Sequence, residues 1–178
     1  MENEKKLKEL ILYICFKSET DESFGATKLN KILFYADFLA YIRLGKAITG
    51  EEYVALSQGP APKNLIPIRE ELVNEKRLAI RKRDYYGKNQ QKPIALDAPD
   101  LSLFSPTEIA FIDDLIEKVR DMNATEISNL SHSFMGWRLA EEGEQIPYEV
   151  ALVGSRHVTE RDSEIAQMLE PVAQKYIS

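Results

Sequence analysis

The chain of 178 residues has little cysteine and little histidine, and it lacks long apolar runs. A single cysteine, Cys15, excludes an internal disulfide, and two scattered histidines are too few for a recognisable structural zinc site. No window approaches the roughly 18 consecutive apolar residues that a membrane-spanning helix needs. The charged segment 1–8 also lacks the apolar core of a signal peptide. We therefore expect a cytoplasmic protein that makes no membrane contact and holds no metal or other cofactor.

An excess of positive charge is missing as well. The formal net charge of −6 argues against nonspecific coating of DNA, because a phosphate lattice attracts proteins of net positive charge. Hydrophobic residues nevertheless make up 44% of the chain, and the eight glycines and eight prolines are dispersed, which is typical of a globular protein. The length fits one domain of ordinary size, so we expect residues 1–178 to form a single domain.

Helical spacing of apolar side chains predicts a mostly α fold with a small amount of β-structure (α+β). Cys15 lies on the apolar face of the first predicted helix, and we interpret it as a small buried hydrophobic residue rather than a nucleophile. Ser105 and Glu108 have the spacing of a capping box at the start of a later helix. Periodicity and capping signals predict further helices over residues 64–76, 105–119, 123–130, 133–142 and 159–177.

A second helix, over residues 27–44, is predicted to be the central one. It is apolar around most of its circumference, which is typical of a helix buried on all sides. We expect Thr27 to cap its start and Gly45 to end it. Lys31 and Asp37 lie inside this helix, and their charges need partners if they are buried.

Two short β-elements are expected beside the helices. Residues 52–56 form a predicted strand, followed by a rigid turn made by Gly59, Pro60 and Pro62, because each proline fixes its own φ and restricts the preceding residue. Residues 78–80 and 94–96 are predicted to be the two strands of an antiparallel hairpin with a long polar loop.

Sequence signatures of catalysis are missing. The chain has no glycine-rich phosphate-binding motif, no H-E-x-x-H and no G-x-S-x-G. His132 is the best candidate for a general base, with Asp37 as its partner. The alternative is a histidine at a helix junction that packs against Trp137, and an aspartate paired with a neighbouring lysine, arginine or tyrosine. We favour this structural interpretation for both residues, and we do not expect an enzyme.

The hairpin segment concentrates basic and aromatic residues. Arg81, Arg83, Tyr85 and Tyr86 lie within it, together with further lysines. Cations interleaved with aromatics can contact nucleic acid, dock an acidic protein, or simply form a solvated flank. We favour the solvated flank, then protein docking, and nucleic acid least.

Three segments together resemble one known family. They are Lys28-Leu-Asn-Lys-Ile-Leu-Phe-Tyr-Ala-Asp37, then Ile48-Thr-Gly50 with Tyr53-Val-Ala-Leu56 and Gly59-Pro-Ala-Pro62, then Ser131-His132 with Trp137, Gly143, Ile146 and Tyr148. Each segment is weak alone, but their order and spacing are specific in combination. The chain resembles the Panacea domain, the SocA-like antitoxin family that is also called phage-associated protein, over about residues 7–148.

The resemblance implies a mostly helical domain that acts as the antitoxin of a toxin–antitoxin pair. Members of this family are similar to antitoxins that bind a toxin protein directly and block it, so the implied partner is a cognate toxin encoded by the adjacent gene. The alternatives are an adaptor or phage-associated interaction protein, and a hydrolase that uses His132 and Asp37. Residues 159–177 lie beyond the matching segments and form either a toxin-docking element or the last wall of the core.

The motif positions suggest roles for individual side chains. Gly59, Pro60 and Pro62 have the character of turn residues. Lys31, Tyr35, Asp37, His132 and Trp137 are polar groups that a core tolerates only when they hydrogen-bond to one another or to the backbone. We expect these five residues to form one connected cluster around the central helix, serving either the fold or the binding of a partner.

Overall fold

The computed structural model describes residues 2–152, so the helix expected over residues 159–177 lies outside the described part of the chain. Helices alternate with two small antiparallel sheets, which confirms the predicted mostly α (α+β) class. None of the helices between residues 2 and 152 is both long and apolar enough to cross a membrane. In chain order the elements are α1 Glu2–Lys17, α2 Ala26–Leu44, β1 Tyr53–Leu56, β2 Gly59–Pro62, α3 Leu65–Asn74, β3 Leu78–Tyr85, β4 Lys88–Ala95, the 3-10 helix η1 Leu101–Leu103, α4 Pro106–Val119, α5 Ala124–His132, α6 Met135–Leu139 and the 3-10 helix η2 Tyr148–Leu152.

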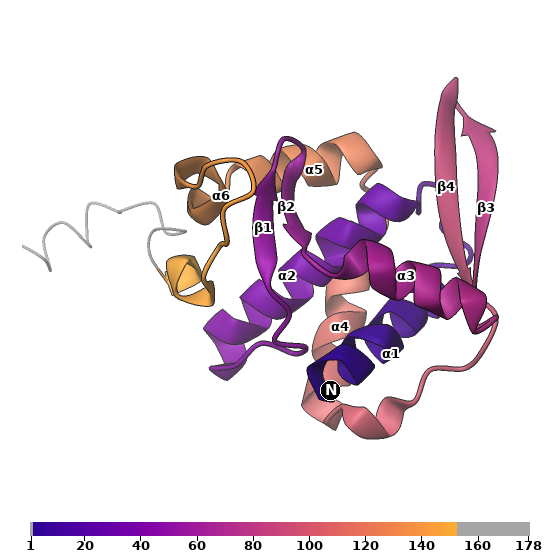
Figure 1. Ribbon diagram of the computed structural model, residues 1–178, viewed down its shortest axis with the longest axis horizontal. Helices are drawn as coiled ribbons and strands as arrows, with labels where there is room; N and C mark the ends of the chain where they lie inside the picture. Colours follow the sequence, from indigo (N-terminus) through magenta and orange to yellow (C-terminus); the bar gives the residue numbers. More distant parts are fainter. Residues whose placement is uncertain (1, 153–178) are drawn as a thin grey trace, which may run out of the picture.

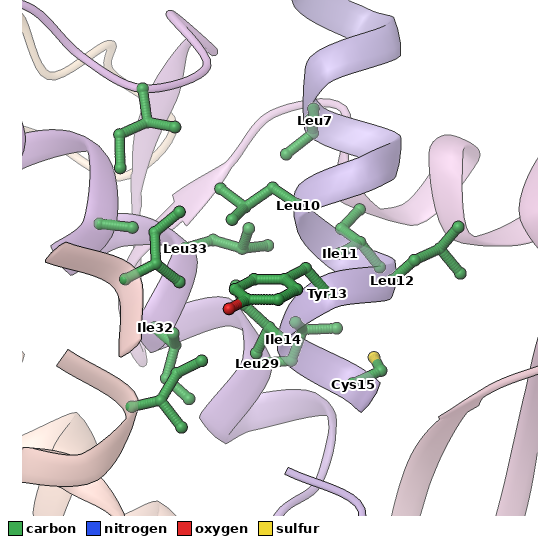
Figure 2. Packing of buried hydrophobic residues seen from close by; sticks show 14 of the residues in the cluster. Leu7, Leu10, Ile11, Leu12, Tyr13, Ile14, Cys15, Leu29, Ile32 and Leu33 are labelled. Atoms are coloured by element: carbon green, nitrogen blue, oxygen red, sulfur yellow. The ribbon is translucent and has the colours of Figure 1, made fainter. Parts of the chain in front are cut away.

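Helix α2 runs through the centre of the molecule, as its all-round apolar character predicts (Figure 1). One side of it packs against α1 and α4, where Leu29, Ile32 and Leu33 meet the apolar face of α1 (Figure 2). Cys15 is buried in this core, and burial raises the pKa of its thiol, so it is the small buried hydrophobic residue that the sequence predicts. The other side of α2 supports a smaller, aromatic cluster built on Phe34, Phe38, Tyr53, Ile146 and neighbouring rings.

The ends of the helices follow local signals, with one exception. Ser105 Oγ accepts from the Glu108 N–H at 3.2 Å and Glu108 Oε2 accepts from the Ser105 N–H at 2.8 Å, which confirms the capping box of α4. Gly45 ends α2 with a φ of 77°, as predicted. The predicted cap at Thr27 is wrong. The chain is already helical at Ala26, so Thr27 lies in the first turn, and the N-cap is Gly25 with no side-chain hydrogen bond.

The segment expected to be a proline turn is instead a strand. Residues 59–62 form β2, which pairs with β1 in the register Tyr53↔Pro62 and Ala55↔Pro60. The backbone groups of Tyr53 and Ala55 bond to residues 143–146, on the side of β1 away from β2. The two prolines therefore sit at alternate positions where the ladder needs no N–H from β2, and the strand keeps its hydrogen bonds.

The second hairpin is longer than the sequence predicts. The pairing of β3 with β4 runs from Leu78↔Ala95 to Tyr85↔Lys88, so the expected polar loop is mostly strand. Tyr86 and Gly87 close it as a two-residue turn, with φ of 50° and 73°. Figure 1 shows the hairpin extending beyond the helical body. It is anchored about midway along by Lys92, whose ammonium donates to the carbonyls of Glu19 and Asp21 at 2.7 and 2.9 Å.

Candidate functional site

The side chain of Lys31 leaves α2 and meets β2. It is 1% exposed, and its ammonium donates to the Pro60 carbonyl at 3.1 Å. Burial lowers the pKa of Lys31 to about 8, because the charged form loses hydration that one carbonyl does not replace. Gly59 makes this approach possible. A Cβ at its position would lie 2.5 Å from Lys31 Nζ and 2.5 Å from Ser131 Oγ, and its φ is +100°.

His132 and Trp137 hold the tip of the same hairpin from α5 and α6. Their rings stack with centroids 4.3 Å apart and an interplanar angle of 15°. The indole N–H of Trp137 donates to the Leu56 carbonyl at 2.8 Å, next to the turn that joins β1 to β2. His132 Nε2 is buried and has no hydrogen-bond partner among the described residues. The sequence-based alternative in which His132 packs against Trp137 is the arrangement found.

Asp37 lies further along α2 and ties the start of β1 to it. Its carboxylate is fully buried and accepts from the Thr49 N–H at 2.7 Å, the Thr49 hydroxyl at 2.5 Å and the Tyr53 hydroxyl at 2.8 Å. Burial raises the pKa of Asp37, and these hydrogen bonds oppose that shift without cancelling it. A second hydroxyl, that of Tyr148, donates to the Glu51 carbonyl at 2.6 Å and secures the same segment.

Tyr35 lies one helical turn after Lys31, on the same face of α2. Its hydroxyl is buried and has no hydrogen-bond partner within residues 2–152, and burial raises its pKa. Its ring packs edge-to-face on Phe34 with centroids 5.0 Å apart, between the two hydrophobic clusters. Tyr35 therefore packs between the two hydrophobic clusters and joins no hydrogen-bonded network of the described residues.

The sequence predicts one polar cluster, whereas the structure places its members in two groups. Lys31 and His132 lie with Gly59 and Ser131 near the tip of the β1–β2 hairpin, and Asp37 lies at the start of β1 with Thr49 and Tyr53. In the part of the chain that the structure describes, no hydrogen bond or ring contact joins Asp37 to His132. The two groups share the β1–β2 hairpin, which both attach to α2.

These contacts attach the β1–β2 hairpin to α2, α5 and α6. The Ser131 hydroxyl, which is fully buried, donates to the Ser128 carbonyl at 2.7 Å. No three potential metal-ligating side chains of His, Cys, Asp or Glu gather within residues 2–152. Sequence reasoning allowed a tyrosine as partner of Asp37 without naming Tyr53, and it missed Thr49, although both lie in the segments that carry the family resemblance.

The residues singled out in the basic hairpin differ in what they contact. Arg83 donates to Gln90 at 2.6 Å and to the Glu22 carbonyl, and its guanidinium lies 5.3 Å from the centroid of the Tyr85 ring. Arg83 is thus used to attach the hairpin to the loop between α1 and α2. Arg81 is exposed, and Tyr86 at the turn is 89% exposed, so these two remain open to solvent.

Comparison with models of known protein families identifies the family of this chain. Comparisons with curated proteins and with solved structures found no match. The sequence model of the family described as "Antitoxin SocA-like, Panacea domain" matches residues 29–138. That range runs from α2 to α6 and contains Lys31, Asp37, the whole β1–β2 hairpin, His132 and Trp137. Because the match covers more than half of the chain, the protein belongs to the SocA-like antitoxin family of Panacea-domain proteins.

Proposed function

We propose that this protein neutralises a cognate toxin, encoded by the adjacent gene, by binding it directly and without catalysis. Membership of an antitoxin family is the observation that carries the proposal. Direct binding is the simplest mechanism for a domain whose motif residues are engaged in its own fold.

The burial of the polar motif residues supports binding over catalysis. Asp37 accepts three hydrogen bonds from its own chain, and the Ser131 hydroxyl bonds to the backbone of its own helix. A general base or nucleophile must reach a substrate atom within about 3 Å, and these fully buried groups offer no such approach. The motif residues therefore serve to position the β1–β2 hairpin and the helices around it.

The proposal is tested by expressing the product of the adjacent reading frame alone and together with this protein. We expect the neighbour to stop growth alone, to be harmless in the pair, and to co-elute with this protein in a stable complex. A neighbour that is harmless alone, or that never co-elutes, overturns the proposal. The lifetime of the neighbour is measured in the same cells, because an adaptor to a protease would shorten it whereas a blocking antitoxin leaves it unchanged.

A matched variant separates binding from catalysis. His132→Gln keeps the size and polarity of the side chain but removes the group that a hydrolase would need as a base. We expect this variant to neutralise the neighbour as wild type does, provided that its thermal midpoint is retained. Loss of neutralisation with the fold and the complex both intact would favour the hydrolase instead.

A further inference from the structure

A groove separates α3 from the base of the β3–β4 hairpin, on the side of the molecule away from α6 (Figure 1). Its volume is about 530 Å³, which is large enough for several side chains of a bound segment. It is open to solvent along α3. Its lining residues are Ile66, Arg69, Glu70, Val73, Asn74, Ile80 and Gln91.

Arg69 is the one lining cation of this groove, and its charge is unmatched. Within residues 2–152 its guanidinium makes no hydrogen bond or ion pair, and its Nε is buried without a partner. Arg77, in the turn between α3 and β3, is paired in the usual way, because its two terminal nitrogens donate to the Glu9 carboxylate at 2.9 and 3.0 Å. A buried donor without an acceptor lowers the stability of the folded protein. An acceptor that the described residues do not supply would therefore bind favourably to the Arg69 guanidinium.

Apolar side chains flank this guanidinium. Ile66, Arg69 and Val73 recur at the spacing of one helix face, so they form a stripe along α3. Ile66 is 68% exposed and Val73 is 39% exposed, so both present apolar surface at the groove. Ile80 of β3 lies opposite the stripe and completes the apolar surroundings.

A second positive charge, that of Lys82, lies on the hairpin beside the groove. Gln91 lines the groove and is paired with Lys82 across the sheet, so Lys82 projects from the same face as Gln91 and Ile80. Glu70 is the single carboxylate of the lining, and it is exposed at the rim. The groove is thus lined by one cation, one carboxylate at its rim and three aliphatic side chains, and Lys82 adds a second cation on the adjoining face of the hairpin.

We propose that this groove is a docking site for a toxin segment in which a carboxylate side chain is flanked by aliphatic residues. The carboxylate would accept the paired N–H donors of Arg69, and the aliphatic side chains would cover Ile66 and Val73. Arginine and a carboxylate match in geometry and charge, and arginine beside apolar contacts is a common energetic centre of protein interfaces. The inference rests on the proposed function for the identity of the partner, but the groove itself can be probed without it.

The first experiment measures the affinity of purified full-length variants for the product of the adjacent gene by titration calorimetry. Arg69→Gln removes the charge and the paired donors, and we expect it to weaken binding about 10- to 100-fold. Val73→Asp tests the apolar wall and is expected to weaken binding by a similar factor. The matched control is Arg81→Gln, which removes an exposed arginine from the opposite face of β3 and should change the dissociation constant less than twofold.

Thermal midpoints are recorded for all three variants, so that a loss of binding is assigned only to a folded protein. Unchanged affinity in folded Arg69→Gln and Val73→Asp overturns the proposal, even where neutralisation by the wild type succeeds. A loss of affinity confined to Arg81→Gln also overturns it, because docking would then use the opposite face of the hairpin.

The second experiment does not depend on the toxin and so separates the two proposals. A library of random dodecapeptides displayed on phage is selected against the full-length protein. We expect enriched peptides to share an aspartate or glutamate beside aliphatic residues and to lose at least 10-fold in affinity for Arg69→Gln. Enriched peptides that bind Arg69→Gln as tightly as the wild type overturn the proposed docking site, whatever the neighbouring gene encodes.

Two other occupants of the groove, a segment of the same chain and a second copy of the protein, predict different experimental results. If the chain's own residues 159–177 fill the groove, then Glu164→Gln with Glu170→Gln should tighten peptide binding by vacating it, and this result overturns the proposal. If a second copy fills it, sedimentation should show a dimer of the wild type that Arg69→Gln dissociates, which overturns it equally. A monomer whose peptide binding is indifferent to Glu164 and Glu170 supports the toxin segment.

Discussion

The ammonium of Lys31 occupies the space beside Gly59 that any other residue would fill with its side chain. A Cβ on Gly59 would lie 2.5 Å from Lys31 Nζ, a separation far shorter than van der Waals contact. The absence of a side chain at this point is therefore what allows a buried lysine of α2 to reach the Pro60 carbonyl. The lysine and the glycine act together to fix the hairpin on the central helix.

Gly59→Ala is expected to destabilise the protein by about 3 kcal/mol, because the alanine is strained at a φ of +100° and displaces both Lys31 and Ser131. Gly143→Ala is the matched control, since Gly143 has a φ of +85° but nothing within 4 Å of its Cβ position. The control should cost about 1 kcal/mol from backbone strain alone. Urea unfolding of both variants measures the difference, and equal losses would contradict the close approach described for Gly59.

The pH dependence of stability should report on Lys31. Burial lowers its pKa from 10.5 to about 8, so between these values the unfolded chain holds a proton that the folded protein has released. Stability rises with pH wherever the unfolded state binds more protons. The free energy of unfolding of the wild type should therefore rise relative to Lys31→Met between pH 8 and 10.5, by at most about 3 kcal/mol. Urea titrations at several pH values measure this difference, and parallel profiles for the two proteins would count against a lowered pKa.

Asp37→Asn tests the second group of contacts. Asp37 Oδ2 accepts hydroxyl protons from both Thr49 and Tyr53, and an amide nitrogen at that position donates instead of accepting. We expect a loss of about 2–3 kcal/mol, with faster amide exchange in residues 48–53. Asp114→Asn, on the exposed face of α4, should change stability by less than about 0.5 kcal/mol. Exchange rates that stay at wild-type values in residues 48–53 would show that Asp37 does not hold this segment.

Sequence reasoning succeeds where the cause is local. The capping box of Ser105 and Glu108 needs only residues three apart, and the end of α2 needs only a glycine that tolerates a positive φ. The buried character of α2 also follows from its own composition. The Thr27 cap failed because helix starts are decided by a shift of one or two residues, which the local pattern does not resolve.

The errors arise where the cause is the register of distant segments. Two prolines in four residues predict a turn. They fit β2 because the backbone groups of Tyr53 and Ala55, which lie opposite them in β1, bond to residues 143–146 and need no N–H from β2. The division of the polar motif residues into two groups depends on which hydroxyls reach Asp37, and that is set by tertiary packing. Arg69 carried no signal in the sequence, because a missing partner is visible only once the neighbours are placed.

The prolines of β2 also limit how this protein can associate with others. The outer edge of β2 would present the backbone N–H groups of residues 60 and 62, and proline has none at either position. This edge therefore has no donor at residues 60 and 62, and the Pro60 carbonyl already accepts from Lys31, so an additional strand from another molecule would find few backbone partners there. The hairpin that anchors the motif residues is thereby closed to growth by strand addition, which protects the protein from aggregating with its own copies.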